Sequence, residues 1–512
     1  MCGLHIDCSV RTAAANLRGV YEAFEDHLAA PRGRGRLRDA AHQGAAGGAP
    51  CGDLITIRVV VEGDRVADAG FDASGCGAAQ AAGSAVVELV RGTPLLDAAK
   101  TTAQDVSNEL GGLSPGKVHA ATLAADALHT AIGRAARAGA PRLRPDPGRT
   151  LVAMSGGVDS AVAALAAREA GHDVVAVTLE LWADPQGDGA RSCCSPESVA
   201  GARALAHSLD LPHFTLDLRD DFEHDVVDDF VAEHAAGRTP NPCVRCNGLV
   251  RFDRMLDLAT SLGAARLATG HYARIARDEH GPLVAAAADA NKDQSYMLAR
   301  LSPAILGRLW FPLAELEKPA VRELASRAKL AVADKPESQD LCFLAGIQAT
   351  DLLKRRGLGA ASGDIVSMDG EKLGTHDGHH LFTIGQRRGL GVSSTEPLYV
   401  IDKDPATNTV TVGPKHALKT QTVQLTDLVL HRPAGQVTHV KLRYRSDPVP
   451  CSLESARDVQ SAICNLQSPF EAVTPGQTAT FLENGAILGC ATISDPSHTV
   501  PTLLPLAASA HV

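Results

Sequence analysis

The sequence lacks any run of about 18 consecutive apolar residues, the length that a membrane-spanning helix needs. Its first residues, Met1 to Asp7, contain no basic segment followed by an apolar stretch, so no secretory signal is predicted. No internal repeat of fixed period is found, which argues against a solenoid or propeller. These absences favour a cytoplasmic, non-repetitive protein with no membrane partner.

An excess of positive charge is also absent. The chain has 49 lysines and arginines against 59 aspartates and glutamates, a net charge of −10. This balance argues against a broadly basic nucleic-acid surface, although local clusters such as Lys354–Arg356 and Arg387–Arg388 leave room for such a partner. At 512 residues the chain exceeds the roughly 250–300 residues that one hydrophobic core supports, so we expect about three or four domains.

The chain contains 12 cysteines. Disulfides are rare in the reducing cytoplasm, so these cysteines predict metal, cluster or sulfur chemistry instead. Two tight pairs occur, Cys193-Cys194 and Cys243-x-x-Cys246. We assign no role to the first pair.

Apolar periodicity predicts an N-terminal α+β domain. A helix is expected within 12–30, strands over 54–61 and 66–71, and further helices over 79–91 and 118–137. The segment 140–148 holds three prolines without apolar periodicity, which is typical of an interdomain linker.

The next part of the chain alternates strands and helices. Buried strands at 151–154, 174–179 and 266–269 are separated by helices at 159–170 and 197–209, which predicts a doubly wound parallel sheet. Beyond about residue 350, short strands predict small β-rich domains, the last one barrel-like. The predicted divisions of this α/β multidomain chain are 1–140, the linker 141–150, the nucleotide domain 151–350, a central domain 351–416, a C-terminal β-barrel-like domain 417–496, and a tail 497–512.

A Ser-Gly-Gly turn joins the strand at 151–154 to the following helix. Its glycines let the backbone approach an anion, and N–H groups at a helix start favour negative charge. The alternative, a plain glycine turn before a capped helix, fits the turn alone but not the whole segment Ser155–Ser160. The Gly-Lys-Ser/Thr ending of the ATPase loop is absent. The segment resembles the SGGxDS loop of the PP-loop ATP pyrophosphatases, which implies that ATP, with Mg²⁺, adenylates an oxygen and releases pyrophosphate.

Further motifs narrow the resemblance. They are Arg238–Asn247, Ala268–Tyr272, Asn291–Tyr296, Gly307–Leu330, Ser338–Phe343, Phe382–Gly391, Lys441–Arg445 and Thr474–Gln477. In order and spacing this series, within 151–495, resembles the bacterial tRNA-specific 2-thiouridylases. The resemblance implies that the C2 oxygen of the wobble uridine, U34, is adenylated and replaced by sulfur.

The resemblance also assigns residues. Cys246 is the implied nucleophile and Cys342 the implied persulfide carrier, since a thiolate or persulfide is the available sulfur nucleophile at neutral pH. A buried small hydrophobe is the alternative for either cysteine. The implied ATP contacts are Ala153, Met154, Ser155, Gly156, Gly157, Val158, Asp159, Ser160, Leu179 and Gly270. The implied contacts to tRNA and its flipped base are Asn241, Pro242, Cys243, His271, Lys292, Asp293, Gln294, Arg443, Tyr444 and Gln477.

One position departs from the family. Where most members have Asn-Pro-Asp, this chain has Asn241-Pro242-Cys243. Three thiols, Cys243, Cys246 and Cys342, could together hold a [4Fe-4S] cluster with one open iron, while a redox CxxC or a zinc site stays an alternative.

The N-terminal part resembles the iron–sulfur scaffold proteins of the NifU/IscU type, over roughly 15–137. The motifs Ala49–Asp53, Ser74–Gly77 and Lys117–Ala120 carry the resemblance. It implies a site for an iron–sulfur cluster or zinc built from Cys51, Asp53, Cys76 and His119. A cysteine that the scaffold family has as a ligand is Ala120 here. The alternatives are that the domain holds a cluster weakly, that Cys2 or Cys8 replaces the missing ligand, or that the domain is degenerate and serves only for docking.

Together these patterns predict a tRNA 2-thiouridylase with a fused scaffold. Expected partners are the anticodon loops of Lys, Glu and Gln tRNAs and a cysteine desulfurase or sulfur-relay donor. The alternatives are a PP-loop sulfurtransferase for another tRNA position or a small molecule, and an iron–sulfur carrier without thiolation activity.

Overall fold

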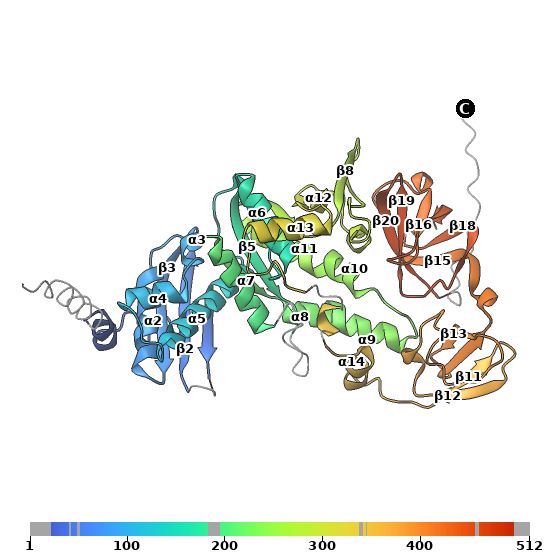
Figure 1. Cartoon of the computed structure of the whole chain (residues 1–512), viewed down its shortest axis with the longest axis horizontal. Coiled ribbons are helices and arrows are strands. Elements are labelled where there is room, and N and C mark those ends of the chain that lie inside the picture. The colour runs from blue at the N-terminus through green and yellow to red at the C-terminus, as the bar shows by residue number, and fades with distance from the viewer. Residues whose placement is uncertain are drawn as a thin grey trace, which may run out of the picture.

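The computed structural model describes residues 22–39, 42–48, 52–182, 195–336, 341–344, 346–455 and 460–495. The chain forms an elongated molecule with the N-terminal domain at one end and two β-rich domains at the other (Figure 1). Within the described residues, none of the helices combines the length and the apolar character that crossing a membrane requires. The predicted tail and the Cys193-Cys194 pair lie outside the described residues.

The N-terminal domain is a three-stranded antiparallel sheet covered by helices. Alternate residues Ile55, Ile57 and Val59 are fully buried, which is why this β-branched segment forms a strand with one face on the core. Two short helices, α3 and α4, were not predicted from the sequence. The elements are a helix over 22–29, β1 (His42–Gly47), β2 (Leu54–Glu62), β3 (Arg65–Ser74), α2 (Gly77–Val90), α3 (Leu95–Ala98), α4 (Ala103–Glu109) and α5 (Val118–Arg137).

The second domain is built on a five-stranded parallel sheet of order β10-β7-β4-β5-β6. The chain winds outward from β4 in both directions, so the switch point of this doubly wound sheet lies at the carboxyl end of β4, where ligands bind in such folds. Its elements are β4 (Asp146–Ala153), α6 (Val158–Glu169), β5 (Asp173–Glu180), α7 (Pro196–Ser208), β6 (His213–Asp217), α8 (Arg219–Phe222), α9 (Asp228–Ala235), α10 (Pro242–Cys246), α11 (Phe252–Ser261), β7 (Ala264–Thr269), α12 (Pro303–Leu306), β10 (Leu309–Trp310) and α13 (Lys318–Arg327).

The proline-rich segment that the sequence predicts as a linker is anchored on both sides. The backbone N–H of Arg142 donates to the carbonyl of Gly63 (2.7 Å), and that of Leu143 donates to the carbonyl of Ser261 (2.9 Å). Strand β4 already begins at Asp146. The first two domains are therefore joined by a short, hydrogen-bonded connection.

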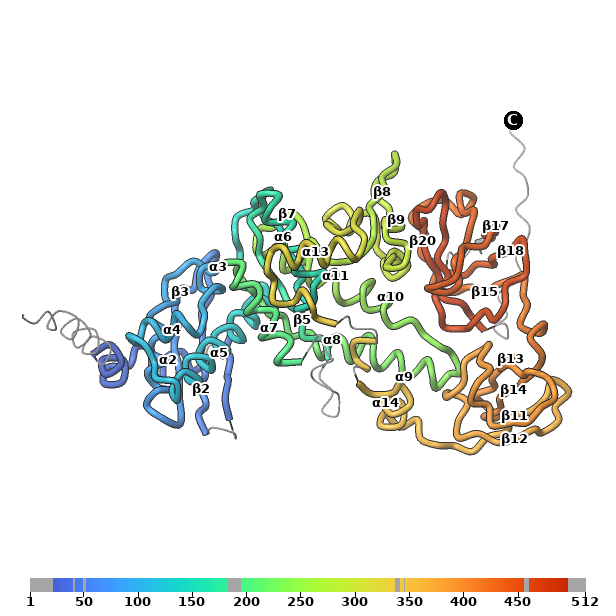
Figure 2. Tube along the Cα trace, viewed as in Figure 1, coloured from blue at the N-terminus to red at the C-terminus, as the bar shows by residue number. Residues whose placement is uncertain are grey.

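Two β-rich domains complete the chain. Six strands, β15 to β20, close into a barrel because β15 pairs with both β18 and β20. Figure 2 shows α9 and α10 running between the parallel sheet and these domains. The predicted α/β multidomain fold class is confirmed. The elements are β8 (Arg274–Asp278) and β9 (Gly281–Ala285), which extend the barrel sheet, α14 (Ala349–Arg355), the central sheet β11 (Gly363–Ser367), β12 (Lys372–His376), β13 (Tyr399–Asp404) and β14 (Thr409–Gly413), and the barrel strands β15 (Lys419–Leu430), β16 (His439–Lys441), β17 (Val449–Ser455), β18 (Ala462–Glu471), β19 (Thr478–Glu483) and β20 (Ala486–Ile493).

Candidate functional site

A glycine loop joins the carboxyl end of β4 to the start of α6. Gly156 has a φ of +69°, a left-handed backbone that favours glycine, and Gly157 is the N-cap residue of the helix. No side chain of the described residues caps α6. The first-turn N–H groups of this helix thus face the switch point of the sheet, an arrangement suited to binding an anion.

Hydrogen bonds within the loop fix its shape. The Ser160 hydroxyl accepts from the Ser155 N–H (3.1 Å) and donates to the Gly157 carbonyl (3.0 Å). At the end of β7, a Cβ on Gly270 would lie 2.8 Å from backbone atoms of Asp159 and Ser160. Gly270 therefore permits the close approach of β7 to the start of α6.

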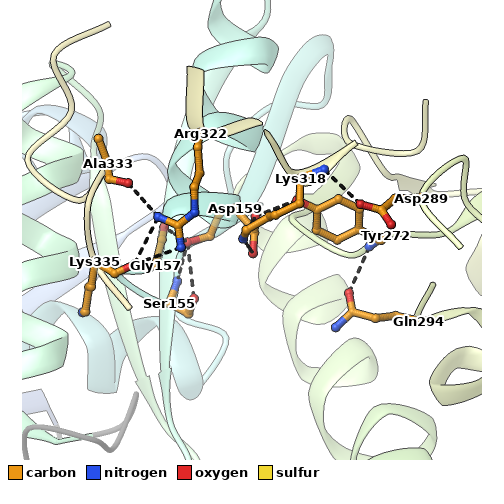
Figure 3. A network of polar contacts seen from close by, with 11 residues as sticks. Ser155, Gly157, Asp159, Tyr272, Asp289, Gln294, Lys318, Arg322, Ala333 and Lys335 are labelled. Carbon is orange, nitrogen blue, oxygen red and sulfur yellow. Dashed lines mark hydrogen bonds and ion pairs between the residues drawn. The ribbon is translucent and has the colours of Figure 1, made fainter. Parts of the chain in front are cut away.

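The carboxylate of Asp159 is the centre of a polar network (Figure 3). The Lys318 ammonium lies 2.6 and 2.7 Å from its two oxygens, and the Tyr272 hydroxyl donates to it at 2.9 Å. The backbone N–H of Lys318, the first residue of α13, donates to the carboxylate of Asp289 (3.0 Å). The Lys318 side chain is only 10% exposed. Asp159, in the glycine loop, is thus held by Lys318 and Tyr272, two residues from remote parts of the chain.

A cavity of about 470 Å³ opens over this loop. Most of the predicted ATP contacts line it, namely Ala153, Met154, Ser155, Gly157, Val158, Asp159, Ser160, Leu179 and Gly270. Four of the predicted tRNA contacts line it as well, namely His271, Lys292, Gln294 and Tyr444. Sequence reasoning missed further lining residues, including Thr178, Arg251, Lys318, Lys335 and Arg445. Arg445 ends the motif Lys441–Arg445 and Lys318 lies within the matching segment Gly307–Leu330, but neither was assigned a role; Thr178, Arg251 and Lys335 lie outside the motifs and reach the cavity from separate elements.

His271 and Gln294 are held firmly at the cavity. The His271 ring nitrogen Nδ1 lies 2.7 Å from the Thr269 hydroxyl, and burial lowers the pKa of His271 to about 3, with Arg251 adding to the effect. Gln294 accepts a side-chain hydrogen bond from the Tyr272 N–H (3.0 Å) and donates its own N–H to the Tyr272 carbonyl (2.8 Å). His271 is therefore neutral at physiological pH.

The predicted nucleophile lies on a short helix. Asn241 caps α10 by accepting from the Val244 N–H (3.3 Å), and Cys243 and Cys246 stand one turn apart on it. The chain continues directly into a π-helical turn at Asn247–Arg251, a geometry frequent at functional sites.

The three candidate thiols differ in their surroundings. Burial, reinforced by Cys246, raises the pKa of Cys243 to about 11, while Arg251 opposes the shift. Cys246 is buried in the main hydrophobic core, and the half-buried Cys342 packs against the same core. Cys243 is therefore a neutral thiol at physiological pH unless a metal ion displaces its proton.

The other predicted tRNA residues connect the barrel to the parallel-sheet domain. The Tyr444 hydroxyl donates to the Asp293 carbonyl (3.0 Å), and the Gln477 amide donates to the Thr239 carbonyl (2.8 Å). The Asp293 carboxylate accepts from the N–H and hydroxyl of Ser295 and so shapes its own loop. The Arg443 guanidinium donates to the Ala472 carbonyl, and burial lowers its pKa.

A second cavity, of about 360 Å³, lies between α9, the segment before α10, and the barrel. Asn241 lines it, together with the ion pairs Glu233–Arg238 and Asp229–Arg245. Asn241 therefore faces a polar space on the barrel side of the cysteine helix.

In the N-terminal domain, Asp53, Cys76 and His119 place their ligand atoms within 4.8 Å of one another. An Asp53 carboxylate oxygen lies 3.2 Å from the Cys76 sulfur and 2.9 Å from the His119 ring nitrogen Nε2. The backbone N–H of Cys76, followed by His119, lowers the pKa of Asp53. Thiolate, imidazole and carboxylate together suit zinc or iron.

The remaining predicted ligands of this domain differ in status. Cys51 lies outside the described residues. Ala120, beside His119 on α5, is fully buried and offers no ligand atom. Among the described residues, Asp53, Cys76 and His119 are the one group of three or more possible ligands whose atoms all lie within 4.8 Å of one another. The sulfurs of Cys243, Cys246 and Cys342 do not form such a group. The N-terminal site and the cysteine helix belong to different domains.

Family models match nearly the whole chain. They are described as NifU-like N terminal domain (21–138), tRNA methyl transferase HUP domain (148–346), tRNA methyl transferase PRC-barrel domain (350–414) and Aminomethyltransferase beta-barrel domain (419–493).

Curated relatives match at high identity. The chain is 43% identical over 468 residues to the Bifunctional protein NifU/MnmA of Rubrobacter xylanophilus, covering 89% of this chain and 94% of that protein. It is 40% identical over 351 residues to the tRNA-specific 2-thiouridylase MnmA of Geobacter metallireducens, covering 67% and 95% of the two chains. The corresponding protein of Salinispora tropica is 45% identical over 361 residues, covering 68% and 99%.

Proposed function

The chain belongs to the MnmA family of tRNA-specific 2-thiouridylases and carries a NifU-like domain at its N-terminus, and from this membership we propose that it converts the wobble uridine of tRNA to 2-thiouridine at the expense of ATP. Lys, Glu and Gln tRNAs are its proposed substrates, and the cytoplasm, where tRNA is modified, its proposed location. One observation supports the proposal above others: a single cavity is lined both by the loop Ser155–Ser160 and by the side chains of Lys292, Gln294 and Tyr444. A nucleotide and an RNA base could meet there.

The first step follows from the loop. The uracil C2 oxygen is a poor leaving group, so it attacks the α-phosphorus of ATP, and the bond to the bridging oxygen breaks to release pyrophosphate. Backbone N–H groups at the start of α6 bind the phosphates. The other proposed ATP contacts are Leu179 and Gly270, at the ends of β5 and β7. We propose that Mg²⁺ accompanies the bound ATP.

The second step places sulfur on C2 and expels AMP. We propose that Cys342 carries the sulfane sulfur from a desulfurase or relay protein as a persulfide, whose outer sulfur bonds to C2 as the C2–O bond to AMP breaks. Cys246 then attacks the inner sulfur of Cys342 and breaks the S–S bond, so that the outer sulfur stays on C2 and the two cysteines share a disulfide. A dithiol reductant must reduce this disulfide before the next turnover.

Two sites are candidates for iron. A [4Fe-4S] cluster on Cys243, Cys246 and Cys342 would supply an open iron for sulfide. Cys243 and Cys246 stand one turn apart, but among the described residues the three sulfurs do not form a compact ligand group, so the persulfide route is the first candidate for the sulfur source. In the N-terminal domain Asp53, Cys76 and His119, with Cys51, would hold an iron–sulfur cluster or zinc. Iron and acid-labile sulfide analysis of the anaerobically purified full chain tests both.

The decisive experiment follows pyrophosphate, nucleotide products and modified nucleosides together. With ATP, a sulfur donor and unmodified tRNA, the full chain should release AMP and pyrophosphate and form 2-thiouridine, and omission of tRNA should stop pyrophosphate release. The Asp159→Ala variant should lose turnover while keeping its fold. Formation of ADP and phosphate would contradict the assignment, and pyrophosphate release without any 2-thiouridine would favour another target for the activated oxygen.

A further inference from the structure

Two lysines from outside the glycine loop contact it and line the same cavity. The Lys335 ammonium donates to the Gly156 carbonyl (2.9 Å), and the Lys318 ammonium contacts Asp159; both side chains line the 470 Å³ cavity. Lys318 begins α13, and Lys335 follows that helix. One short stretch of chain thus brings two cations to opposite parts of the same loop.

The segment that carries these lysines is itself held in place. The Arg322 guanidinium, on α13, donates to the carbonyls of Ala333 (2.9 Å) and Lys335 (3.4 Å), as Figure 3 shows. The backbone N–H of Lys318 is fixed by Asp289 (3.0 Å), and its ammonium lies 5.9 Å from the centre of the Tyr272 ring. Lys318 therefore projects toward the loop from a rigid base.

The charges at the loop require such a cation. A polyphosphate bound at the start of α6 would lie beside the Asp159 carboxylate, and two anionic groups at short range repel each other strongly in a partly buried site. Lys318 lines the cavity and contacts that carboxylate, and its side chain is only 10% exposed. A fixed ammonium in a site with little water stabilises developing charge more than a solvated one does.

We propose that Lys318 and Lys335 bind the β- and γ-phosphates of ATP and stabilise the departing pyrophosphate, an inference that rests on the proposed function. As the uracil oxygen bonds to the α-phosphorus, the electron pair of the breaking bond moves onto pyrophosphate, and the uracil N3 proton leaves to water. Both lysines line the cavity beside the loop, where their ammonium groups would neutralise this negative charge. Lys318 is the principal contact, because it is the more buried and the better anchored of the two.

A purely structural lysine that only holds Asp159 would behave differently from a phosphate ligand. The test compares the full-length Lys318→Met, Lys335→Met and Lys318→Arg variants with the wild type, measuring dissociation constants for ATP, pyrophosphate and AMP by calorimetry. AMP lacks the β- and γ-phosphates, so it also reports whether each variant keeps a folded adenosine site. Lys100→Met is the matched control, because Lys100 forms an exposed ion pair with Asp210 (3.1 Å) away from the cavity.

The expected result is a selective loss. Lys318→Met weakens ATP and pyrophosphate binding about tenfold or more, the effect of losing a charge-assisted hydrogen bond, while AMP binding changes less than about twofold. Lys335→Met shows a smaller loss of the same kind, and Lys318→Arg retains part of the affinity. Equal weakening of ATP and AMP, or unchanged binding of ATP and pyrophosphate by Lys318→Met, overturns the inference. A wild-type chain that binds no ATP refutes the proposed function instead, so the two failures are distinct.

Discussion

Gly133 of α5 lies directly against Thr215 of β6: a Cβ at position 133 would be 2.2 Å from the Thr215 carbonyl oxygen. The helix of the N-terminal domain thus packs on the edge strand of the parallel sheet, and the two domains share one hydrophobic core. Ion pairs of Lys100 with Asp210 (3.1 Å) and Arg137 with Asp221 (2.7 Å) border this contact. The N-terminal domain is consequently a docked part of the enzyme rather than a tethered one.

This contact predicts that Gly133→Ala weakens the docking of the two domains. The added methyl group meets a backbone oxygen that cannot rotate away, so we expect a destabilisation of about 1–3 kcal/mol, typical of overpacking. Thermal unfolding and limited proteolysis near residues 138–145 measure it. Gly201→Ala on α7 is the matched control, because nothing lies within 4 Å of its Cβ position. Equal melting curves for the two variants would show that the contact between α5 and β6 accommodates the added methyl group.

Gly270→Ala should impair nucleotide binding. Its methyl group would lie 2.8 Å from backbone atoms of Asp159 and Ser160 and would displace the first turn of α6. We expect the KM for ATP to rise about tenfold or more, since a displacement of about 1 Å at a positioned loop is costly. Steady-state pyrophosphate release as a function of ATP concentration gives this value, and an unchanged KM would refute the close-approach argument.

Cys246→Ser and Cys342→Ser should each abolish 2-thiouridine formation. A serine hydroxyl at neutral pH neither carries sulfane sulfur nor attacks a disulfide, although it fits the same volume. Nucleoside analysis of tRNA after incubation with each variant measures the loss, and retained ATP binding provides the control for folding. Near-normal thiolation by either variant would remove that thiol from the mechanism.

Cys243→Asp distinguishes the two sulfur sources. If Cys243 holds a cluster, the substitution removes a ligand. The protein should then lose the roughly four irons of the three-cysteine site, and its activity should fall with them. If the persulfide route operates, the variant restores the residue that most of the family has and should stay active. A Cys243→Asp enzyme that stays fully active, whatever iron the N-terminal site retains, would refute the cluster hypothesis. Iron analysis and thiolation of the same anaerobic preparation decide the question.

Acid should destabilise the protein from about pH 6.5 downward. Burial holds the pKa of His213 and His129 well below the usual 6.5, and that of His271 at about 3. The unfolded chain binds protons on these rings below pH 6.5, whereas the folded chain does not, so stability is complete above 6.5 and is lost as pH falls toward 3. Each ring contributes at most about 1.4 kcal/mol per pH unit. Melting temperatures from pH 7.5 to 5 measure the trend; His213→Gln should flatten it, and a melting temperature independent of pH would refute it.

Local sequence patterns were sufficient for the features that depend on neighbouring residues. The glycines and serines of Ser155–Ser160 determine a strand–loop–helix connection by their own backbone preferences, and the β-branched residues of Leu54–Glu62 determine a strand by their periodicity. The cysteine spacing likewise determined that Cys243 and Cys246 stand one turn apart once a helix forms there. The fold class followed from the same alternation of elements.

Tertiary structure alone decided which remote groups meet. Lys318 reaches Asp159, 159 residues away in sequence, and Tyr444 reaches the Asp293 loop, because the sheet order and the closed barrel bring their elements together. The docking of α5 on β6 through Gly133 could not be predicted from the sequence either, because an isolated glycine in a helical pattern indicates only a less stable helix. The physical reason is that such contacts stem from packing between elements, whereas periodicity and turn preference report only on the element that contains them.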